Sequence, residues 1–227
     1  MNWQKAKHNS PLMLIAGYGE GLGVALRQKF EQAGYRVIGL ARKGGDIQVD
    51  LTDGNAVTDV LHTLIQEHGV PDVVITNTAR FHYGPLGNVS EQEFEQVWRT
   101  GVMSSFHLAR QLLPMMAERG HGCFIATGAT ASVKGGGAFS AFASAKFALR
   151  GLVQSLAREF GPKGVHVAHL IVDGMLWSDA SRRRFPALTQ DKAISVGDAA
   201  EVYLQLTRQP RTAWTQELDI RPFNERY

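Results

Sequence analysis

The chain has 227 residues, of which 44% are hydrophobic and 20% are charged, and its formal net charge is only +3. This balance is typical of a globular protein and excludes a disordered chain. The length suits one α/β domain that spans residues 1–227. Because the charge is weak and no DNA-binding motif is present, nucleic acid is not expected as a partner.

Cysteine content and hydrophobic runs bear on the compartment. A single cysteine, Cys123, leaves no internal disulfide and fits a reducing compartment. The polar N-terminus Met1–Ser10 is followed by an apolar run that is too short for the core of a signal peptide. No stretch approaches the ~20 apolar residues that a membrane span needs. We therefore expect a cytoplasmic protein with no membrane partner.

Apolar strands alternate with amphipathic helices along the chain. Because most strands are apolar nearly throughout, the sheet is expected to be parallel and covered by helices on both faces. The predicted strands are residues 12–16, 36–41, 47–51, 72–76, 122–127, 165–172 and 214–220, and the predicted helices are 21–34, 53–68, 90–119, 139–160 and 197–208.

The connection between the second and third predicted strands is unusually short. It consists of Arg42 to Asp46, which is too few residues for a helical crossover between parallel neighbours. Either the third strand is short and irregular, or the helix usual at this point is missing and a tight loop replaces it.

Glycines follow the first predicted strand and open the first helix. They have the spacing Gly17-x-x-x-Gly21-x-Gly23, and Gly19 adds further freedom. Such glycines let the backbone turn sharply and approach a diphosphate, which the N–H groups and dipole of the helix N-terminus attract. The alternative is a glycine-rich turn that serves packing alone.

Several motifs in this order resemble those of the short-chain dehydrogenase/reductase superfamily, from about Leu12 to Thr207. T-G-x-x-x-G-x-G matches Ala16–Gly23, the acidic–apolar pair matches Asp50-Leu51, N-N-A-G matches Thr76–Ala79, Y-S-A-S-K matches Phe142–Lys146, and P-G-x-x-x-T matches Asp173–Ser178. The resemblance implies a Rossmann-type doubly wound parallel sheet of six to seven strands. It also implies assembly into a homodimer or homotetramer through long helices that include residues 139–160.

The same resemblance implies a nicotinamide dinucleotide cofactor and the residues that would bind it. These are Gly17, Gly19, Gly21, Leu22, Gly23, Arg42, Asp50, Leu51, Asn77, Lys146, Gly174 and Ser178.

Charges at the end of the second strand bear on which dinucleotide binds. A carboxylate there would bind the ribose hydroxyls of NAD and repel a 2′-phosphate. Ala41 holds this position and is followed by Arg42 and Lys43, which favours NADP over NAD. Glu20 argues in the other direction, because NADP-preferring relatives often carry a base at that place in the glycine loop.

The catalytic set implied by the resemblance is asparagine, serine, tyrosine and lysine. The matching positions hold Gly101, Ala129, Phe142 and Lys146, so the lysine alone remains. We expect Lys146 to hold the nicotinamide ribose, with proton donation as the alternative role. Asp173 replaces a proline at the end of an apolar strand, where burial would raise the pKa of its carboxyl. It could transfer a proton or orient substrate, or simply form a turn.

Other candidates are weaker. His82 and Tyr83 lie in a loop that lines the substrate pocket in the family, and Trp177 could stack on an aromatic substrate; a surface or packing role is the alternative for each. His166 and His169 are three apart on a strand and so point to opposite faces. No cluster with metal-ligand spacing is present, so no metal site is expected.

Two classes of function follow. The first is an NAD(P)-dependent oxidoreductase with altered acid–base residues that acts on a small carbonyl or alcohol. The second is a catalytically silent dinucleotide-binding protein that serves as a sensor or an assembly partner. We favour the oxidoreductase.

Overall fold

The computed structural model describes residues 10–224. The N-terminal segment, for which the sequence predicts no signal peptide, lies outside the described residues. Seven parallel strands form one sheet in the order β3-β2-β1-β4-β5-β6-β9. The predicted α/β fold of the Rossmann type is confirmed. The strands are β1 (Leu12–Ala16), β2 (Arg36–Ala41), β3 (Ile47–Gln48), β4 (Val73–Thr76), β5 (Gly122–Ala129), β6 (Val165–Val172) and β9 (Glu217–Ile220).

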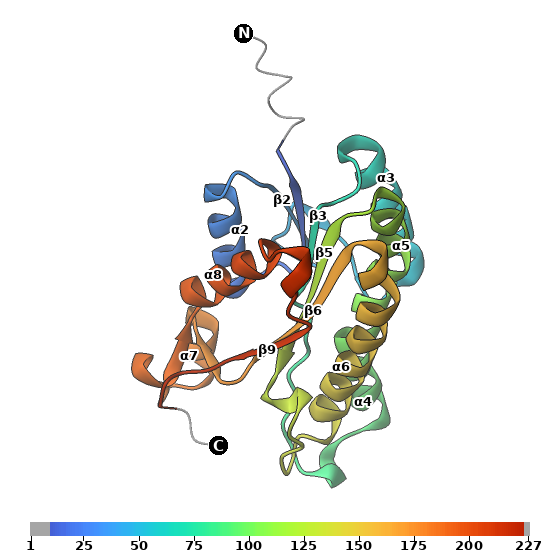
Figure 1. Ribbon diagram of the computed structural model, residues 1–227. Helices are drawn as coiled ribbons and strands as arrows, with labels where there is room; N and C mark the ends of the chain where they lie inside the picture. Colours follow the sequence, from blue (N-terminus) through green and yellow to red (C-terminus); the bar gives the residue numbers. More distant parts are fainter. Residues whose placement is uncertain (1–9, 225–227) are drawn as a thin grey trace.

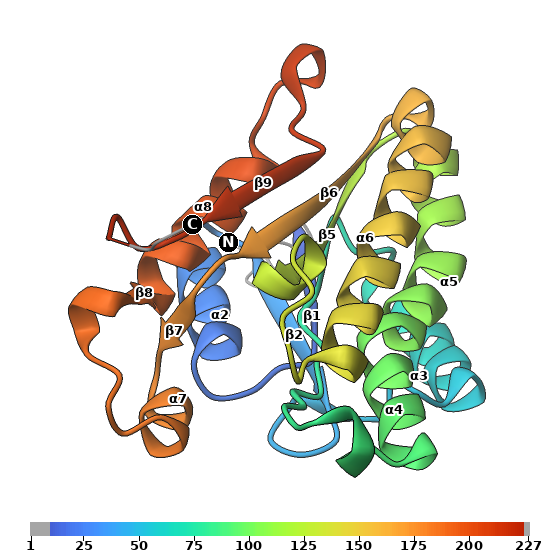
Figure 2. The same cartoon turned by 90° about the horizontal axis from the view of Figure 1, so that it is seen from below.

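Helices cover both faces of the sheet, as Figures 1 and 2 show. On one face lie α2 (Leu22–Gln32) and α8 (Val196–Thr207), and on the other lie α3 (Gly54–His68), α5 (Ser104–Arg119) and α6 (Ser140–Phe160). A hydrophobic core lies on each face of the sheet, and alternate strand residues point into one core or the other. Leu12 and Leu14 pack on one side of β1, and Met13 and Ile15 on the other. This explains why the strands are apolar throughout.

The connection from β2 to β3 contains no helix, as predicted, and β3 is also shorter than the predicted residues 47–51. Asp46 holds the connection against β2. Its carboxylate accepts a hydrogen bond of 2.7 Å from the backbone N–H of Gly39 and pairs with Arg27 of α2. These contacts lower the pKa of Asp46 although partial burial opposes them. The third strand is therefore short, and a tight loop also replaces the helix before it.

The predicted long helix of residues 90–119 is divided. Ser90 and Glu93 form the expected capping box at the start of α4 (Glu91–Trp98). A π-helical turn, η2 (Arg99–Met103), then leads into α5. A turn of this type inserts an extra residue per turn and often marks a functional site.

Short elements after β6 were not predicted. β7 (Met175–Trp177) and β8 (Ala193–Ser195) form a separate parallel pair, with α7 (Asp179–Arg184) between them in the chain. This segment lies beside α2 and α8 (Figure 2). The 3-10 turns are η1 (Leu86–Asn88), η3 (Thr130–Ser132), η4 (Gly161–Lys163), η5 (Gln190–Lys192) and η6 (Arg211–Ala213). Among the helices of residues 10–224, none has the length and apolarity needed to cross a bilayer.

Candidate cofactor and active site

Gly17 makes the sharp bend after β1. Its φ is +85°, and a Cβ at this position would stand 2.7 Å from the carbonyl oxygen of Asn77. The side-chain amide of Asn77 in turn donates a hydrogen bond of 3.4 Å to the carbonyl of Gly17. Gly19 differs, since a Cβ there would meet no atom within 4 Å. The bend is thus fixed against the end of β4, while its tip remains open.

The start of α2 has the features of an anion-binding helix end. Gly21 is its N-cap residue, with a φ of +89°, and no side chain caps the first turn. The first N–H groups of such a helix have no partner within it and attract an anion. The side chain of Leu22 is buried in the core, so Leu22 could contribute only its backbone N–H to a diphosphate.

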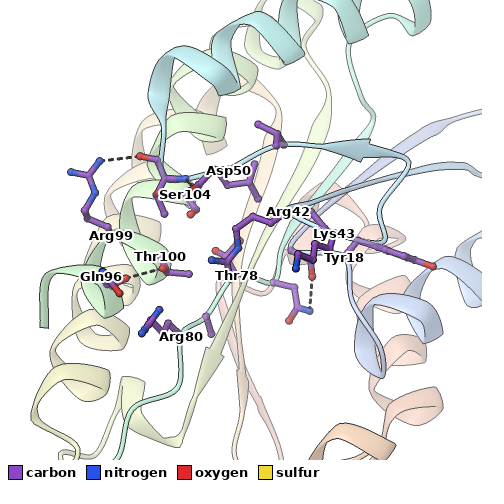
Figure 3. Close-up of a pocket in the computed structure, with 17 residues that line it drawn as sticks. Tyr18, Arg42, Lys43, Asp50, Thr78, Arg80, Gln96, Arg99, Thr100 and Ser104 are labelled. Carbon is purple, nitrogen blue, oxygen red and sulfur yellow. Dashed lines mark hydrogen bonds between the residues drawn. The ribbon is translucent and has the colours of Figure 1, made fainter. Parts of the chain in front are cut away.

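A cavity of about 930 Å³ lies at the carboxyl ends of β1 to β4 (Figure 3). Five of the predicted cofactor residues line it, namely Gly17, Arg42, Asp50, Leu51 and Asn77. Lys43, which the sequence indicates for the choice of cofactor, also lines it. The predictions missed other residues of its lining, which include Tyr18, Thr78, Arg80, Gln96, Arg99, Thr100 and Ser104. Those after Asn77 come from the loop beyond β4 and from α4, η2 and α5, whose approach to the strand ends is a tertiary feature.

Positive charge dominates this cavity. Arg42, Lys43, Arg80 and Arg99 line it together with the single acid Asp50. The Asp50 carboxylate accepts bonds of 2.9 Å from the backbone N–H of Thr52 and 2.8 Å from its hydroxyl. These bonds, with the charges of Arg42 and Arg99, lower the pKa of Asp50. The cavity is therefore suited to a phosphorylated ligand.

Lys146 of α6 is buried near the end of β5 and does not line the cavity. It is only 3% exposed, and its Nζ donates a hydrogen bond of 2.8 Å to the carbonyl oxygen of Thr127 at the end of β5. Burial lowers the pKa of Lys146 from 10.5 to about 8. Its ammonium thus lies near the carboxyl end of β5, shielded from water. A ribose hydroxyl could accept a hydrogen bond from it there. Its role in binding and catalysis stays a prediction.

Replacing Lys146 by methionine is expected to change how stability varies with pH. Between about pH 8 and 10.5, the unfolded chain binds a proton at this lysine that the folded chain has lost. The free energy of unfolding therefore rises with pH across this window, by at most about 3 kcal/mol. Urea unfolding of the wild type and of Lys146→Met should differ by this slope. The exposed Lys134→Met serves as the control, and equal slopes for the wild type and Lys146→Met would contradict the prediction.

The three positions that the resemblance assigns to catalytic polar groups form apolar packing. Phe142 and Ala129 belong to a hydrophobic cluster between η3, α4 and α6. The Phe142 ring lies 5.9 Å from the Nζ of Lys146. Gly101 lies in the π-helical turn, where a Cβ would stand 3.3 Å from the Cβ of Ala145 on α6.

Asp173 does not have the apolar surroundings expected from the sequence. Its Oδ1 accepts a hydrogen bond of 2.7 Å from the hydroxyl of Thr130, and its Oδ2 pairs with the guanidinium of Arg221 at 3.2 Å. An ion pair suits a carboxylate that accepts hydrogen bonds and orients its neighbours. Whether Asp173 takes part in proton transfer or orients substrate stays a prediction.

A series of polar contacts centred on buried His169 lies near Lys146. His169 is inaccessible; its Nδ1 lies 3.2 Å from Glu217, which also forms two bonds of 2.7 Å with Arg150. Its Nε2 lies 3.4 Å from the hydroxyl of Ser132. Burial lowers the pKa of His169, and nearby Lys146 lowers it further, although Glu217 opposes both. The net effect disfavours the protonated form of His169 inside the core.

The segment after β6 contacts the glycine loop at Glu20 and Gly21. A Cβ on Gly21 would stand 3.0 Å from the Cβ of Ser178, so this predicted pair of cofactor residues lies in contact. Arg183 of α7 forms an ion pair of 2.8 Å with Glu20. Gly174, whose φ is +152°, lies against Pro222. The pair with Arg183 offsets the negative charge that Glu20 places beside the diphosphate site.

The weaker candidates are spread around this site. Tyr83 is 64% exposed and packs on Phe139, while Arg182 stacks on Trp177 at 5.3 Å. His166 stacks on Trp214, so it is directed away from the surroundings of His169. Cys123 is buried, which raises its pKa to about 12. Within residues 10–224, no group of three or more His, Cys, Asp or Glu side chains could hold a metal ion.

Comparisons with known proteins agree with this geometry. The profile of a family described as short chain dehydrogenase matches residues 11–187. Over 210 residues the chain is 26% identical to the 3-oxoacyl-[acyl-carrier-protein] reductase FabG of Escherichia coli (strain K12), which covers 84% of this chain and 86% of that protein. It is 25% identical over 164 residues to an NADPH-dependent pterin aldehyde reductase of Arabidopsis thaliana, covering 65% of this chain and 68% of that one.

Solved structures share the fold over almost the whole chain. A short-chain dehydrogenase from Rhodopseudomonas palustris has a TM-score of 0.80 at 30% identity and covers 94% of this chain and 99% of its own. ElxO with NADP bound has a TM-score of 0.85 at 18% identity, with 93% and 97% covered. The second comparison supports the fold alone.

Proposed function

Because the chain belongs to the short-chain dehydrogenase family, we propose that it is an oxidoreductase that prefers NADP and acts on a small carbonyl or alcohol with an altered acid–base set. NAD(P)-dependent oxidoreduction is the activity that the family resemblance supports. The preference for NADP, the role of each residue and the kind of substrate are parts of the proposal. The observation that carries it is the open, cationic cavity at the glycine bend.

The residues present fit a dinucleotide. The bend at Gly17 leaves no room for a side chain, Gly19 is open, and the first turn of α2 has no side-chain cap. Two cations, Arg42 and Lys43, follow β2 and line the cavity, where they suit a 2′-phosphate. When bound, the dinucleotide supplies the hydride for the carbonyl carbon, while the protein provides position and charge.

At the reacting end, Lys146 is the polar group left from the family set. We propose that its ammonium holds the nicotinamide ribose, and that a proton reaches the substrate oxygen from Lys146 or from water. Asp173, fixed by Thr130 and Arg221, would orient the substrate. Since the pKa of Lys146 is about 8, binding that requires its charge should weaken as the pH rises above that value.

Charge reversal at Arg42 tests the choice of cofactor. Arg42→Asp is expected to weaken NADPH binding by about 10- to 100-fold, because charge-assisted hydrogen bonds contribute about 1.5–3 kcal/mol. NADH binding should stay the same or improve. Fluorescence titration of both dinucleotides measures this, with Arg158→Asp, an exposed change on α6, as the control. If the wild type binds neither dinucleotide, the proposed function fails; if Arg42→Asp changes nothing, only the NADP preference fails.

We also propose that the chain forms a homodimer or homotetramer through α4, α5 and α6. Each of these helices exposes a phenylalanine: Phe94 at 40%, Phe106 at 37% and Phe147 at 43%. Phe106→Glu is expected to raise the dissociation constant of the oligomer at least tenfold, roughly the effect of losing one buried aromatic side chain. Analytical ultracentrifugation measures this, with Val133→Glu as the control, because Val133 is also an exposed hydrophobic residue. A monomeric wild type would contradict the proposal.

A further inference from the structure

Four phenylalanine rings gather around Phe81, one of them near Lys146, and we call them the phenylalanine cluster: Phe81, Phe139, Phe142 and Phe185. Phe81 lies at the centre, with its ring 5.3 Å from that of Phe142, 5.9 Å from Phe139 and 6.2 Å from Phe185. They come from the loop after β4, the start of α6 and the end of α7, which lie on the same side of the molecule (Figure 2). The tertiary fold thus brings together rings from three segments of the chain.

This cluster makes the surroundings of Lys146 on α6 apolar. Phe142 is a turn from Lys146 on α6, and the ring is 5.9 Å from the Nζ. Ala129, at the end of β5, packs in the same hydrophobic cluster as Phe81 and Phe142. The cluster therefore offers ring faces and edges to a ligand, and aromatic pairs of this kind prefer tilted and edge-to-face contacts. Such a surface favours a ligand with a planar aromatic ring. It offers no hydrogen bonds to a polar aliphatic ligand.

Arg184 marks the outer end of the cluster. Its guanidinium lies 4.2 Å from the centre of the Phe81 ring and 5.8 Å from that of Phe185. Its neighbours are engaged elsewhere, because Arg182 pairs with Asp179 and Arg183 pairs with Glu20. Within residues 10–224, no acidic side chain forms an ion pair with Arg184. A guanidinium over a ring can still donate its N–H groups to an anion, and a carboxylate fits that fork with two hydrogen bonds.

We propose that the substrate of this site is an aromatic carbonyl compound or alcohol that carries a carboxylate. The substrate ring packs on the phenylalanine cluster, its carboxylate binds the edge of Arg184, and its reacting carbon faces the Lys146 end. The inference rests on the proposed function, because Lys146 marks the reacting end only if a dinucleotide binds there. It goes further than the proposed function because it names a substrate class and the two features that select it, the phenylalanine cluster and Arg184.

The test uses a pair of probes with the same ring system, of which one carries a charged carboxylate and the other a neutral amide. 2-Naphthoate and 2-naphthamide are titrated by calorimetry into the protein saturated with NADP⁺. We expect naphthoate to bind at least tenfold more tightly than naphthamide. Arg184→Gln is expected to remove this difference by weakening naphthoate about 10- to 100-fold, the loss of a charge-assisted pair, with naphthamide unchanged. Phe81→Leu is expected to weaken both probes by a similar factor, because both lose the same ring contact.

A matched control comes from the same helix. Arg182→Gln also removes a guanidinium stacked on an aromatic ring, that of Trp177, yet it is expected to leave both probes unchanged. Equal binding of the two probes, binding of neither, or equal losses in Arg182→Gln and Arg184→Gln would overturn the inference. NADP⁺ binding is measured first without a probe. A protein that binds no dinucleotide overturns the proposed function and this inference with it, whereas a dinucleotide complex that does not bind naphthoate overturns this inference alone.

Discussion

Valine at Gly17 is expected to abolish dinucleotide binding. The φ of +85° is strained for a β-branched residue, and the added Cβ would stand 2.7 Å from the carbonyl oxygen of Asn77. The bend must shift, so the N–H groups at the start of α2 move away from the diphosphate. Losing two charge-assisted hydrogen bonds weakens binding by at least about 100-fold. The strain also lowers the free energy of unfolding by about 2 kcal/mol.

The neighbouring Gly19 separates these two effects. A Cβ there meets no atom within 4 Å, so Gly19→Ala should leave the melting temperature of the empty protein unchanged. If the diphosphate passes over this open tip, the same variant weakens NADPH binding. Calorimetric titration and thermal unfolding of both variants measure the pair of effects. Normal NADPH binding by a folded Gly17→Val protein would refute the cofactor site.

Restoring the family's hydroxyl groups is expected to raise turnover. In Phe142→Tyr with Ala129→Ser, a phenol stands one helical turn from Lys146, whose Nζ is 5.9 Å from the present ring, and a serine hydroxyl stands at the end of β5. General acid–base catalysis supplies about 10²- to 10⁴-fold. We expect kcat with a carbonyl panel and NADPH to rise by roughly 10²-fold, while the dissociation constant of NADPH stays within about twofold.

Phe139→Tyr is the matched control for this gain. Phe139 contacts Phe81 in the same cluster, but it is not spaced one turn before Lys146, so its phenol should leave turnover unchanged. Stopped-flow NADPH oxidation follows all three proteins. Tight NADPH binding without turnover in the wild type, not rescued by the double variant, would instead support the silent dinucleotide-binding protein. The family comparisons do not favour that alternative.

Much of the fold was readable from local signals. The apolar runs at β1 and β6, the capping box of Ser90 and Glu93, and the short connection after Ala41 each have a sequence cause that acts within a few residues. The third strand was overestimated because an apolar pattern cannot reveal that pairing with β2 stops after Gln48. The π-helical turn at residues 99–103 was missed because its residues differ little from those of an ordinary helix.

The site was predictable where a motif gives backbone geometry, and less so where distant side chains meet. Gly17 and Asn77 were both predicted as cofactor residues, and they lie in contact. Arg221 is far from Asp173 in sequence, so no spacing rule could indicate that the two form an ion pair. The same holds for Glu20 and Arg183, which are 163 residues apart.

The connection after β2 has a consequence for how cofactor preference could be transferred between proteins. Asp46 ties it to the Gly39 N–H and to Arg27, so Arg42 and Lys43 are carried by a segment that is anchored before any ligand arrives. Such preorganisation lowers the ordering cost of binding. Residues 42–46 and Arg27 would then act as one structural unit. Grafting this unit into a homologue is a way to transfer the binding of a phosphate group.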